Sequence, residues 1–329
     1  MKKIITILVT AVMMAGSLTA CGTTGVQNGT GAGKISVVTT IFPEYDWVMN
    51  ILGDDPAGAE VTMLLDNGVD LHSYQPTVDD ILKISTCDLF IYVGGESDEW
   101  VEDALKEATN KDMVVIDLLE VLGDKVKEEE VVEGMQEEEE SEEHEEAEEG
   151  PEYDEHVWLS LRNAAVLTDS ISKALQKIDE KNAAVYQQNA DAYIAKLNDL
   201  DKKYEDAVSS ASVKTLLFGD RFPFRYLTDD YGLSYYAAFV GCSAETEASF
   251  ETITFLAGKV DELGLHAVMT IEGADHRIAE TIVQNTNTKD QQILTMDSMQ
   301  SVTSKDVESG TTYLSVMEND LEVLKEALK

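Results

Sequence analysis

Hydrophobic and polar residues follow two alternating patterns along the first half of this chain. Short apolar runs rich in β-branched residues, typical of buried strands, occupy residues 35–40, 60–65, 88–93 and 113–116. Between them lie segments with helical spacing of apolar residues, one of which begins after Thr77, a favourable N-cap residue. Strands that alternate with helices predict a mostly parallel sheet covered on both faces.

A longer helical region follows this half of the chain. In it, Tyr186, Ala190, Tyr193 and Leu197 recur at alternating intervals of four and three residues. The pattern predicts a helix over residues 181–208 that is roughly 40 Å long, enough to connect two lobes. Asp179 precedes this helix and is its expected N-cap. The apolar stripe covers too few heptads to favour a coiled coil.

The second half returns to alternating strands and helices. Strands are predicted at residues 213–219, 235–240, 267–271 and 292–296, and a closing helix at residues 312–328. The pair Phe222-Pro223 follows the first of these strands as Phe42-Pro43 follows the first strand of the chain, which superposes Asp220 on Thr40. This short match predicts two related units that begin with the same strand, turn and helix.

The patterns together predict an α/β fold with two (β/α) lobes and mostly parallel sheets, joined by a long rigid helix. The predicted segments are an N-terminal lobe, linking helices and a C-terminal lobe, at residues 35–160, 161–208 and 209–329.

The N-terminus has the features of an export signal. A positive start precedes an uncharged apolar run that is too short to span a membrane comfortably, so residues 1–20 are predicted to be a signal peptide. The run ends in Leu18-Thr19-Ala20-Cys21, which looks like a bacterial lipobox, with Cys21 as the lipidated residue; the alternative is an ordinary secretory signal with an incidental cysteine. Residues 21–34 are rich in small polar residues and predict a flexible tether. We therefore expect an extracytoplasmic protein that is anchored to the cell membrane by lipid.

Charge excludes one class of partner. The 64 Asp and Glu residues outnumber 24 Lys and Arg, and the formal net charge is -40, which argues against nucleic acid. Much of the excess lies in residues 128–149, where 14 of 22 residues are glutamate. So many like charges cannot form a core, and we expect residues 125–153 to form a mobile, disordered acidic loop.

Four residues could bind a metal ion. His72, Asp220 and Asp297 each follow a predicted strand, at the edge where parallel sheets bind ligands, and His156 lies just before an apolar run, at the start of the helical region. Two imidazoles and two carboxylates suit Zn²⁺ or Mn²⁺. The four residues therefore form a candidate metal-binding set.

Two cysteines remain beyond the lipobox. Cys87 and Cys242 fall in different predicted lobes, and an extracellular setting permits a disulfide. Their separation favours two unpaired thiols.

Several segments resemble one known family over nearly the whole chain. They are the lipobox, Leu71-His-Ser-Tyr-Gln-Pro-Thr77, Asp154-Glu-His-Val-Trp-Leu-Ser160, Tyr226-Leu-Thr-Asp-Asp-Tyr-Gly-Leu233, Gly241-Cys-Ser-Ala-Glu-Thr-Glu-Ala-Ser249 and Met296-Asp-Ser298. In this order they resemble the lipoprotein metal receptors of zinc and manganese ABC importers. The resemblance implies a monomeric receptor without catalytic activity that captures one divalent metal ion and delivers it to an ABC transporter permease.

The resemblance also implies a ligand set in the cleft between the lobes. His72 and His156 match the family's two histidine positions, and Asp297 matches its carboxylate position. The third ligand departs from the family, because Arg221 has the expected spacing before Tyr226 and cannot bind a cation. A one-residue insertion would make Asp220 the ligand.

Glu245 or a water molecule is the substitute for Asp220. Glu245 and Glu272 could also act as acceptors that orient the histidines.

The choice of metal follows from intrinsic affinity more than from the ligand set. Two histidines with two carboxylates resemble the manganese receptors, yet zinc binds more tightly than manganese at almost any nitrogen and oxygen site. Zinc is therefore the expected ion and manganese the next candidate. The acidic loop is either a solubilising insert or a collector of cations. The alternative functions are a surface adhesin that contains a structural metal and a metal-dependent hydrolase.

Overall fold

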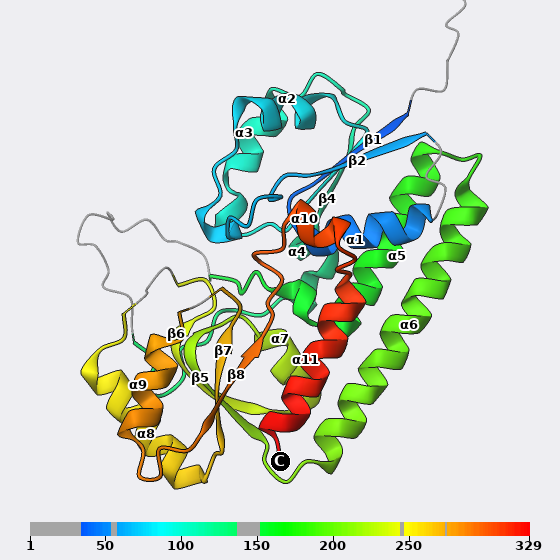
Figure 1. Cartoon of the computed structure of the whole chain (residues 1–329). Coiled ribbons are helices and arrows are strands. Elements are labelled where there is room, and N and C mark those ends of the chain that lie inside the picture. The colour runs from blue at the N-terminus through cyan, green and yellow to red at the C-terminus, as the bar shows by residue number, and fades with distance from the viewer. Residues whose placement is uncertain (1–33, 54–57, 137–151, 244–246, 274) are drawn as a thin grey trace, which may run out of the picture. The chain divides into compact units, whose positions relative to one another are not determined.

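Two four-stranded parallel sheets with helices on both faces confirm the α/β prediction (Figure 1). The computed structural model describes residues 34–53, 58–136, 152–243, 247–273 and 275–329. The predicted signal peptide, lipobox and Cys21 lie outside the described residues, as do Glu245 and residues 137–151 of the acidic tract.

The first sheet has the strand order β2-β1-β3-β4, with the β-branched Val37 and Val38 of the central strand fully buried. Its strands are β1 (Ile35–Thr39), β2 (Ala59–Met63), β3 (Leu89–Tyr92) and β4 (Val114–Asp117). The helices around it are α1 (Phe42–Leu52), α2 (Val78–Thr86), α3 (Trp100–Lys106) and α4 (Leu118–Leu122). Thr77 caps α2 as predicted, since its hydroxyl accepts a hydrogen bond from the Asp80 N–H group.

Short 3-10 turns position several loops at the carboxyl edge of this sheet. They are η1 (Leu71–Ser73), η2 (Glu96–Asp98), η3 (Gly123–Lys125) and η4 (Val157–Leu159).

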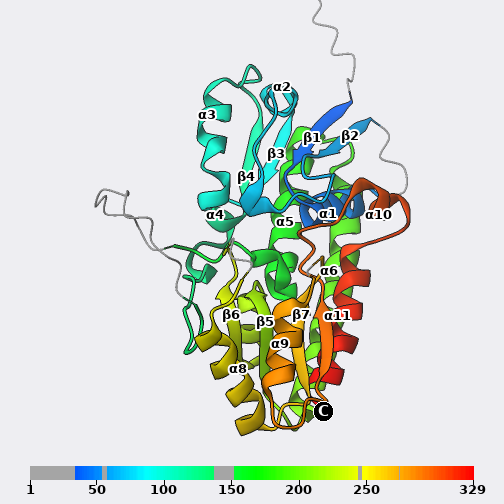
Figure 2. The same cartoon turned by 60° about the vertical axis from the view of Figure 1, so that its left-hand side comes forward.

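Two antiparallel helices, α5 (Leu161–Ile178) and α6 (Ala183–Ser210), run side by side, and the longer α6 extends from the first sheet to the second (Figures 1 and 2). The tyrosine and leucine stripe of α6 is buried, as its spacing predicted. The expected N-cap was wrong, because Asp179 ends α5 and Asn182 precedes α6. The Asp179 carboxylate instead accepts hydrogen bonds from the side chains of Asn182 and Tyr186.

The second sheet has the order β6-β5-β7-β8. Its strands are β5 (Thr215–Phe222), β6 (Ser234–Val240), β7 (Ala267–Ile271) and β8 (Gln292–Met296). The helices around it are α7 (Arg225–Tyr231), α8 (Phe250–Leu263), α9 (Arg277–Asn285) and α11 (Tyr313–Ala327). Helix α10 (Ser304–Glu308) lies near the first sheet, where the Ser304 N–H group donates to the Asp66 carbonyl (Figure 1). α8 and α9 pack on one face, while α11 packs between the sheet and α6 (Figure 2).

The main hydrophobic core is continuous from the first sheet through α5 and α6 to α11 and part of the second sheet. A smaller core lies between the second sheet and the helices α8 and α9. The boundaries of the lobes expected from the sequence stay predictions.

The end of β5 and the start of the predicted acidic loop both differ from expectation. β5 was predicted to end at Gly219, but it continues through Phe222 with a register shift between Phe218 and Arg221, as a β-bulge allows. Asp220 therefore lies within the strand and not after it.

The first part of the predicted acidic loop is ordered. Residues 125–136 are placed, and the Gln136 N–H group donates to the carbonyl of Ala238 in β6. Arg225 pairs with Glu130 in the same segment, and Met135 is buried. Neutralised charges and apolar residues between them explain why this part packs onto the protein.

None of the helices that the structure describes is long and apolar enough to cross a membrane.

Candidate metal centre

His72 lies on η1, in the loop that follows β2. The Asp70 side chain caps this turn by accepting a hydrogen bond from the His72 N–H group at 3.0 Å. The Nδ1 atom of His72 lies 2.8 Å from the Ser97 hydroxyl and 3.5 Å from a Glu155 carboxylate oxygen. These partners occupy the Nδ1 side of the ring, so that Nε2 is the atom it presents to the second histidine.

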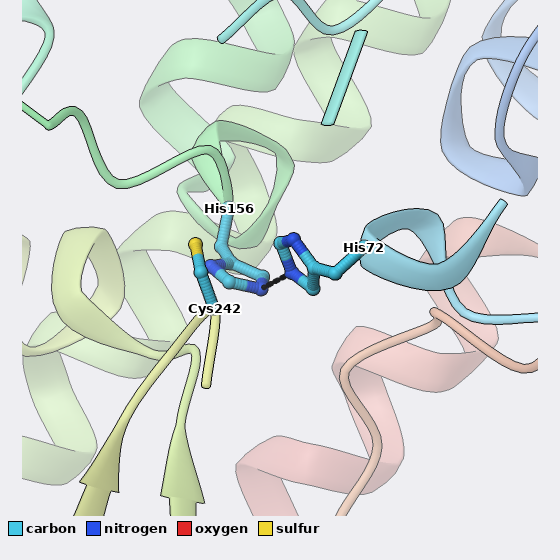
Figure 3. A group of neighbouring side chains, drawn as sticks. All are labelled: His72, His156 and Cys242. Atoms are coloured by element: carbon cyan, nitrogen blue, oxygen red, sulfur yellow. Dashed lines mark hydrogen bonds between the residues drawn. The ribbon is translucent and has the colours of Figure 1, made fainter. Parts of the chain in front are cut away.

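His156 is fully buried at the start of η4. One oxygen of Asp154 accepts from the His156 backbone N–H group at 2.9 Å and contacts the ring Nδ1 atom at 3.0 Å. The Nε2 atoms of His156 and His72 lie 3.2 Å apart, which is the contact dashed in Figure 3. Histidines that ligate metals are commonly held by a carboxylate on the other ring nitrogen, and His156 has this arrangement.

Cys242 completes a group of three metal-competent side chains. Its sulfur and the ring nitrogens of both histidines lie within 4.8 Å of one another, and the thiol is free (Figure 3). Cys242 follows β6 directly after Gly241, where a Cβ atom would meet the His156 ring at 3.0 Å. Sequence reasoning treated Cys242 only as an unpaired thiol. Its position just after a predicted strand, the signal used for Asp297, could have identified it.

Asp220 is not part of this group. Its two oxygens accept hydrogen bonds from the backbone N–H groups of Arg221, at 3.0 Å, and Ile271, at 3.2 Å. Arg221, the next residue on β5, forms an ion pair with Asp70, beside His72. The bulged strand therefore brings the guanidinium of Arg221, and not the carboxylate of Asp220, toward the histidines.

Asp297 lies at the end of β8 and is also outside the group, as judged over the residues that the structure describes. One of its oxygens accepts from the Met299 N–H group at 2.8 Å. Burial raises the pKa of Asp297 to about 6, and the nearby charge of Glu272 acts in the same direction.

Glu272 holds the loop that follows Asp297. It accepts hydrogen bonds from the backbone and the hydroxyl of Ser298, both at 2.7 Å, and from the Gln300 backbone at 3.2 Å. Glu272 thereby fixes the chain around Asp297, and the Gln300 side-chain amide donates to the Ser298 hydroxyl at 3.0 Å. Among the described contacts, the Glu272 carboxylate binds this loop and neither histidine.

The pKa values of the two histidines are shifted in opposite directions. Burial lowers the pKa of His72 to about 3, and the charge of His156 adds to this effect. Burial also opposes protonation of His156, but the charge and hydrogen bond of Asp154 outweigh it and raise the pKa of His156. Arg221 acts to lower the pKa of both rings, so that its positive charge is felt where a cation would bind.

Known proteins give this arrangement a context. The family model described as zinc-uptake complex component A, periplasmic, matches residues 37–327. The high-affinity zinc uptake system protein ZnuA of Bacillus subtilis is 30% identical over 311 residues, which cover 94% of this chain and 93% of that protein. The zinc-binding lipoprotein AdcA of Streptococcus pneumoniae is 31% identical over 326 residues, covering 99% of this chain and 61% of that protein.

A solved structure shows the same fold. The Zn(II)-bound ZnuA-like domain of S. pneumoniae AdcA superposes with a TM-score of 0.69 at 28% identity, covering 90% of this chain and 99% of that one. The chain spans only 56% of the length of the AdcA proteins of Streptococcus pyogenes that it matches.

Proposed function

The chain belongs to the family of zinc-uptake complex component A, and on that premise we propose that it captures a divalent transition metal outside the cytoplasm and delivers it to an ABC permease. The names of its relatives, which speak of zinc binding and zinc uptake, support this function over the adhesin and the hydrolase. On the same ground we propose that it has no catalytic activity.

The observation that carries the proposal is the pair of imidazoles. The Nε2 atoms of His72 and His156 face each other at 3.2 Å, and the other ring nitrogens contact Ser97 and Asp154. An ion between the rings would replace this contact with two metal–nitrogen bonds of about 2.0–2.1 Å. Since partners already orient the rings, binding costs little rearrangement.

A carboxylate from the second sheet would contribute an oxygen donor. Asp297 is the proposed oxygen donor, because it lies at the end of β8 and Glu272 holds the loop around it. Asp220, which the sequence offers for a further ligand position, instead accepts hydrogen bonds from the backbone N–H groups of Arg221 and Ile271. Glu272 is a supporting acceptor that keeps the Asp297 loop in place.

Zinc is the proposed cargo. Imidazole nitrogen is a donor that suits zinc, and zinc exceeds manganese in intrinsic affinity at sites of this kind. The relatives' names point to the same ion. Manganese is the second candidate.

We also propose that the protein works at the cell surface. Residues 1–20 would direct export, and lipid on Cys21 would anchor the mature chain to the membrane. A relative named a lipoprotein supports this location. The proposed receptor acts as a monomer that meets its permease at the membrane.

Metal uptake by cells tests the function. The gene would be disrupted in the organism that carries it, and zinc accumulation would be measured at limiting zinc. Uptake should fall, and the intact gene should restore it, whereas a gene encoding His156→Ala should not. Full zinc uptake without the gene, together with lost adherence to host surfaces, would favour the adhesin instead.

A further inference from the structure

We propose that Cys242 binds the captured metal as a thiolate, in the place that the sequence assigns to Asp220. This inference rests on the proposed function and names the third ligand of that same site.

The geometry of the three side chains is the first support. The sulfur of Cys242 and the ring nitrogens of His72 and His156 lie within 4.8 Å of one another, so small side-chain movements would bring all three onto one ion. The three residues come from separate segments, at η1, before η4 and after β6, and Figure 3 shows Cys242 and His72 on the two sides of the His156 ring.

The backbone around Cys242 is fixed for this approach. The Cys242 N–H group donates to Glu129 at 3.1 Å. Gly241 leaves the space that His156 occupies, since a Cβ atom there would lie 2.9 Å from the Phe222 carbonyl and 3.0 Å from the His156 ring. A side chain at position 241 would therefore separate β6 from the histidine.

Asp220 has a different use, which a carboxyl group of helix α1 shares. Glu44, after β1, accepts hydrogen bonds from the backbone N–H groups of Thr40 and Ile41 at 2.8 and 3.3 Å. Asp220 likewise accepts from Arg221 and Ile271. Both carboxylates satisfy buried backbone donors, and moving Asp220 onto a metal would leave two of them unpaired.

Arg221 makes an anionic ligand more valuable. Its guanidinium lies beside the site, paired with Asp70. A Cys242 thiolate would supply a negative charge that offsets this guanidinium. Asp220 cannot supply it while backbone N–H groups hold its carboxylate. When the metal binds, the S–H bond breaks, a sulfur–metal bond forms, and the proton leaves to Glu129, which hydrogen-bonds the thiol, or to water.

The ligand type selects the metal. A thiolate is a soft donor that favours zinc and cadmium, whereas manganese prefers carboxylate and water oxygens. Two imidazoles and one thiolate leave one position of a tetrahedral zinc site for the Asp297 carboxylate or water. Cys242 would then be the residue that rejects manganese.

Cobalt spectroscopy tests the ligand directly. Purified full-length protein would be loaded with one equivalent of Co²⁺, which reports a bound thiolate through an intense sulfur-to-metal charge-transfer band. The band is expected in the parent protein, in Asp220→Ala and in the matched control Cys87→Ser, whose thiol is buried elsewhere. It should disappear in Cys242→Ser.

Competition titrations supply the affinities. Losing a residue that only supports a metal ligand lowers metal affinity by roughly 10- to 100-fold. Because Cys242→Ser would remove a ligand itself, zinc affinity should fall by about 100-fold or more. Manganese affinity should change far less, so that the zinc-to-manganese preference narrows. If Asp220→Ala folds, its affinities for zinc and manganese should stay within about threefold of the parent values, far less than the loss expected for a supporting residue of the site.

Zinc X-ray absorption of the unmutated protein keeps the test decisive if a variant misfolds. One sulfur scatterer at about 2.3 Å is expected, beside nitrogen and oxygen at about 2.0–2.2 Å. Bound metal without sulfur scattering and without the cobalt band would overturn the role of Cys242 while leaving the receptor intact. No bound metal at all would overturn the proposed function, and this inference with it.

Discussion

The carboxyl edges of the two sheets carry different chemistry. The first sheet contributes two oriented imidazoles, with Ser97 holding His72 and Asp154 holding His156. The second contributes a thiol, a guanidinium and carboxylates that mostly bind backbone N–H groups.

This difference separates two tasks. The first edge is prepared to donate lone pairs to a cation, since each ring already has a partner on its far side. The second edge determines how much negative charge and what kind of donor meet the ion, because Arg221 and Cys242 lie there. We therefore expect mutations on the first edge to remove binding and mutations on the second to tune it.

The largest effect is expected on the first edge. Four-ligand zinc sites bind with about 10–16 kcal/mol, or about 3 kcal/mol per ligand, so His156→Ala should weaken zinc binding by roughly 100-fold or more. Competition with a chelator of known affinity would measure it. His266→Ala is the control, because that imidazole contacts the carbonyl of Glu326, and its zinc affinity should equal that of the parent. An equal loss of zinc affinity in His156→Ala and His266→Ala would mean that His156 has no special role in metal binding.

Gly241→Ala tests whether zinc binding requires the close packing of Gly241 against the His156 ring. The added methyl group would overlap the Phe222 carbonyl and the His156 ring, and overpacking of this kind costs about 1–3 kcal/mol. Both the melting temperature and zinc affinity should fall. Gly258→Ala, within α8, meets nothing within 4 Å and should raise stability by about 1 kcal/mol without changing affinity. Unchanged zinc binding in Gly241→Ala would show that the second edge does not need this close approach.

A gain is expected from Arg221→Gln. A positive charge near a bound cation is repulsive, and its removal should tighten zinc binding by roughly tenfold, equivalent to about 1.4 kcal/mol. The effect should shrink as salt is added. Lys325→Gln makes the same charge change on α11, where Lys325 pairs with Glu322, and should have no effect. Weaker binding in Arg221→Gln would mean that the Asp70 ion pair organises the site and does not oppose the metal.

The smallest effect on zinc affinity is expected at Glu44, whose influence is on folding. Burial, with the charge of Asp98, raises the pKa of Glu44 to about 8, from 4.5 for an ordinary glutamate. Between these values the unfolded chain releases a proton that the native state keeps, so the free energy of unfolding decreases as pH rises.

Glu44→Gln should flatten this decline while leaving zinc affinity unchanged. Urea unfolding at about pH 5 and at about pH 8 would give the change in the free energy of unfolding across most of this pH range. Glu322→Gln, at an exposed site on α11, should keep the parent slope. A parent slope that persists in Glu44→Gln would assign the pH dependence to other buried carboxyls, such as Asp98.

The sequence predicted the fold where local signals were strong. Alternating strand and helix patterns placed both sheets, and the stripe of apolar residues placed α6. The sequence also proposed His72, which follows a strand, and His156, which precedes an apolar turn, and the structure brings their rings together. These signals are local, and tertiary contacts reinforced them.

The second edge could not be predicted in the same way. The Gly219-Asp220-Arg221 segment resembles the end of a strand, yet pairing with β6 continues to Phe222 through a bulge. This shift decides whether residue 220 or residue 221 faces the histidines, and it depends on partners far away in sequence. Cys242 also follows a predicted strand, but its proximity to the two histidines is visible only in the folded chain.

Metal competition on the purified protein tests the central claim most directly. The apo protein would receive equimolar Zn²⁺ and Mn²⁺, and bound metal would be quantified after removal of excess ions. The receptor account predicts one tightly bound zinc per chain, no retained manganese, and loss of the zinc in the double variant His72→Ala/His156→Ala. A protein that retains no stoichiometric metal, or binds zinc equally well without both histidines, would contradict it.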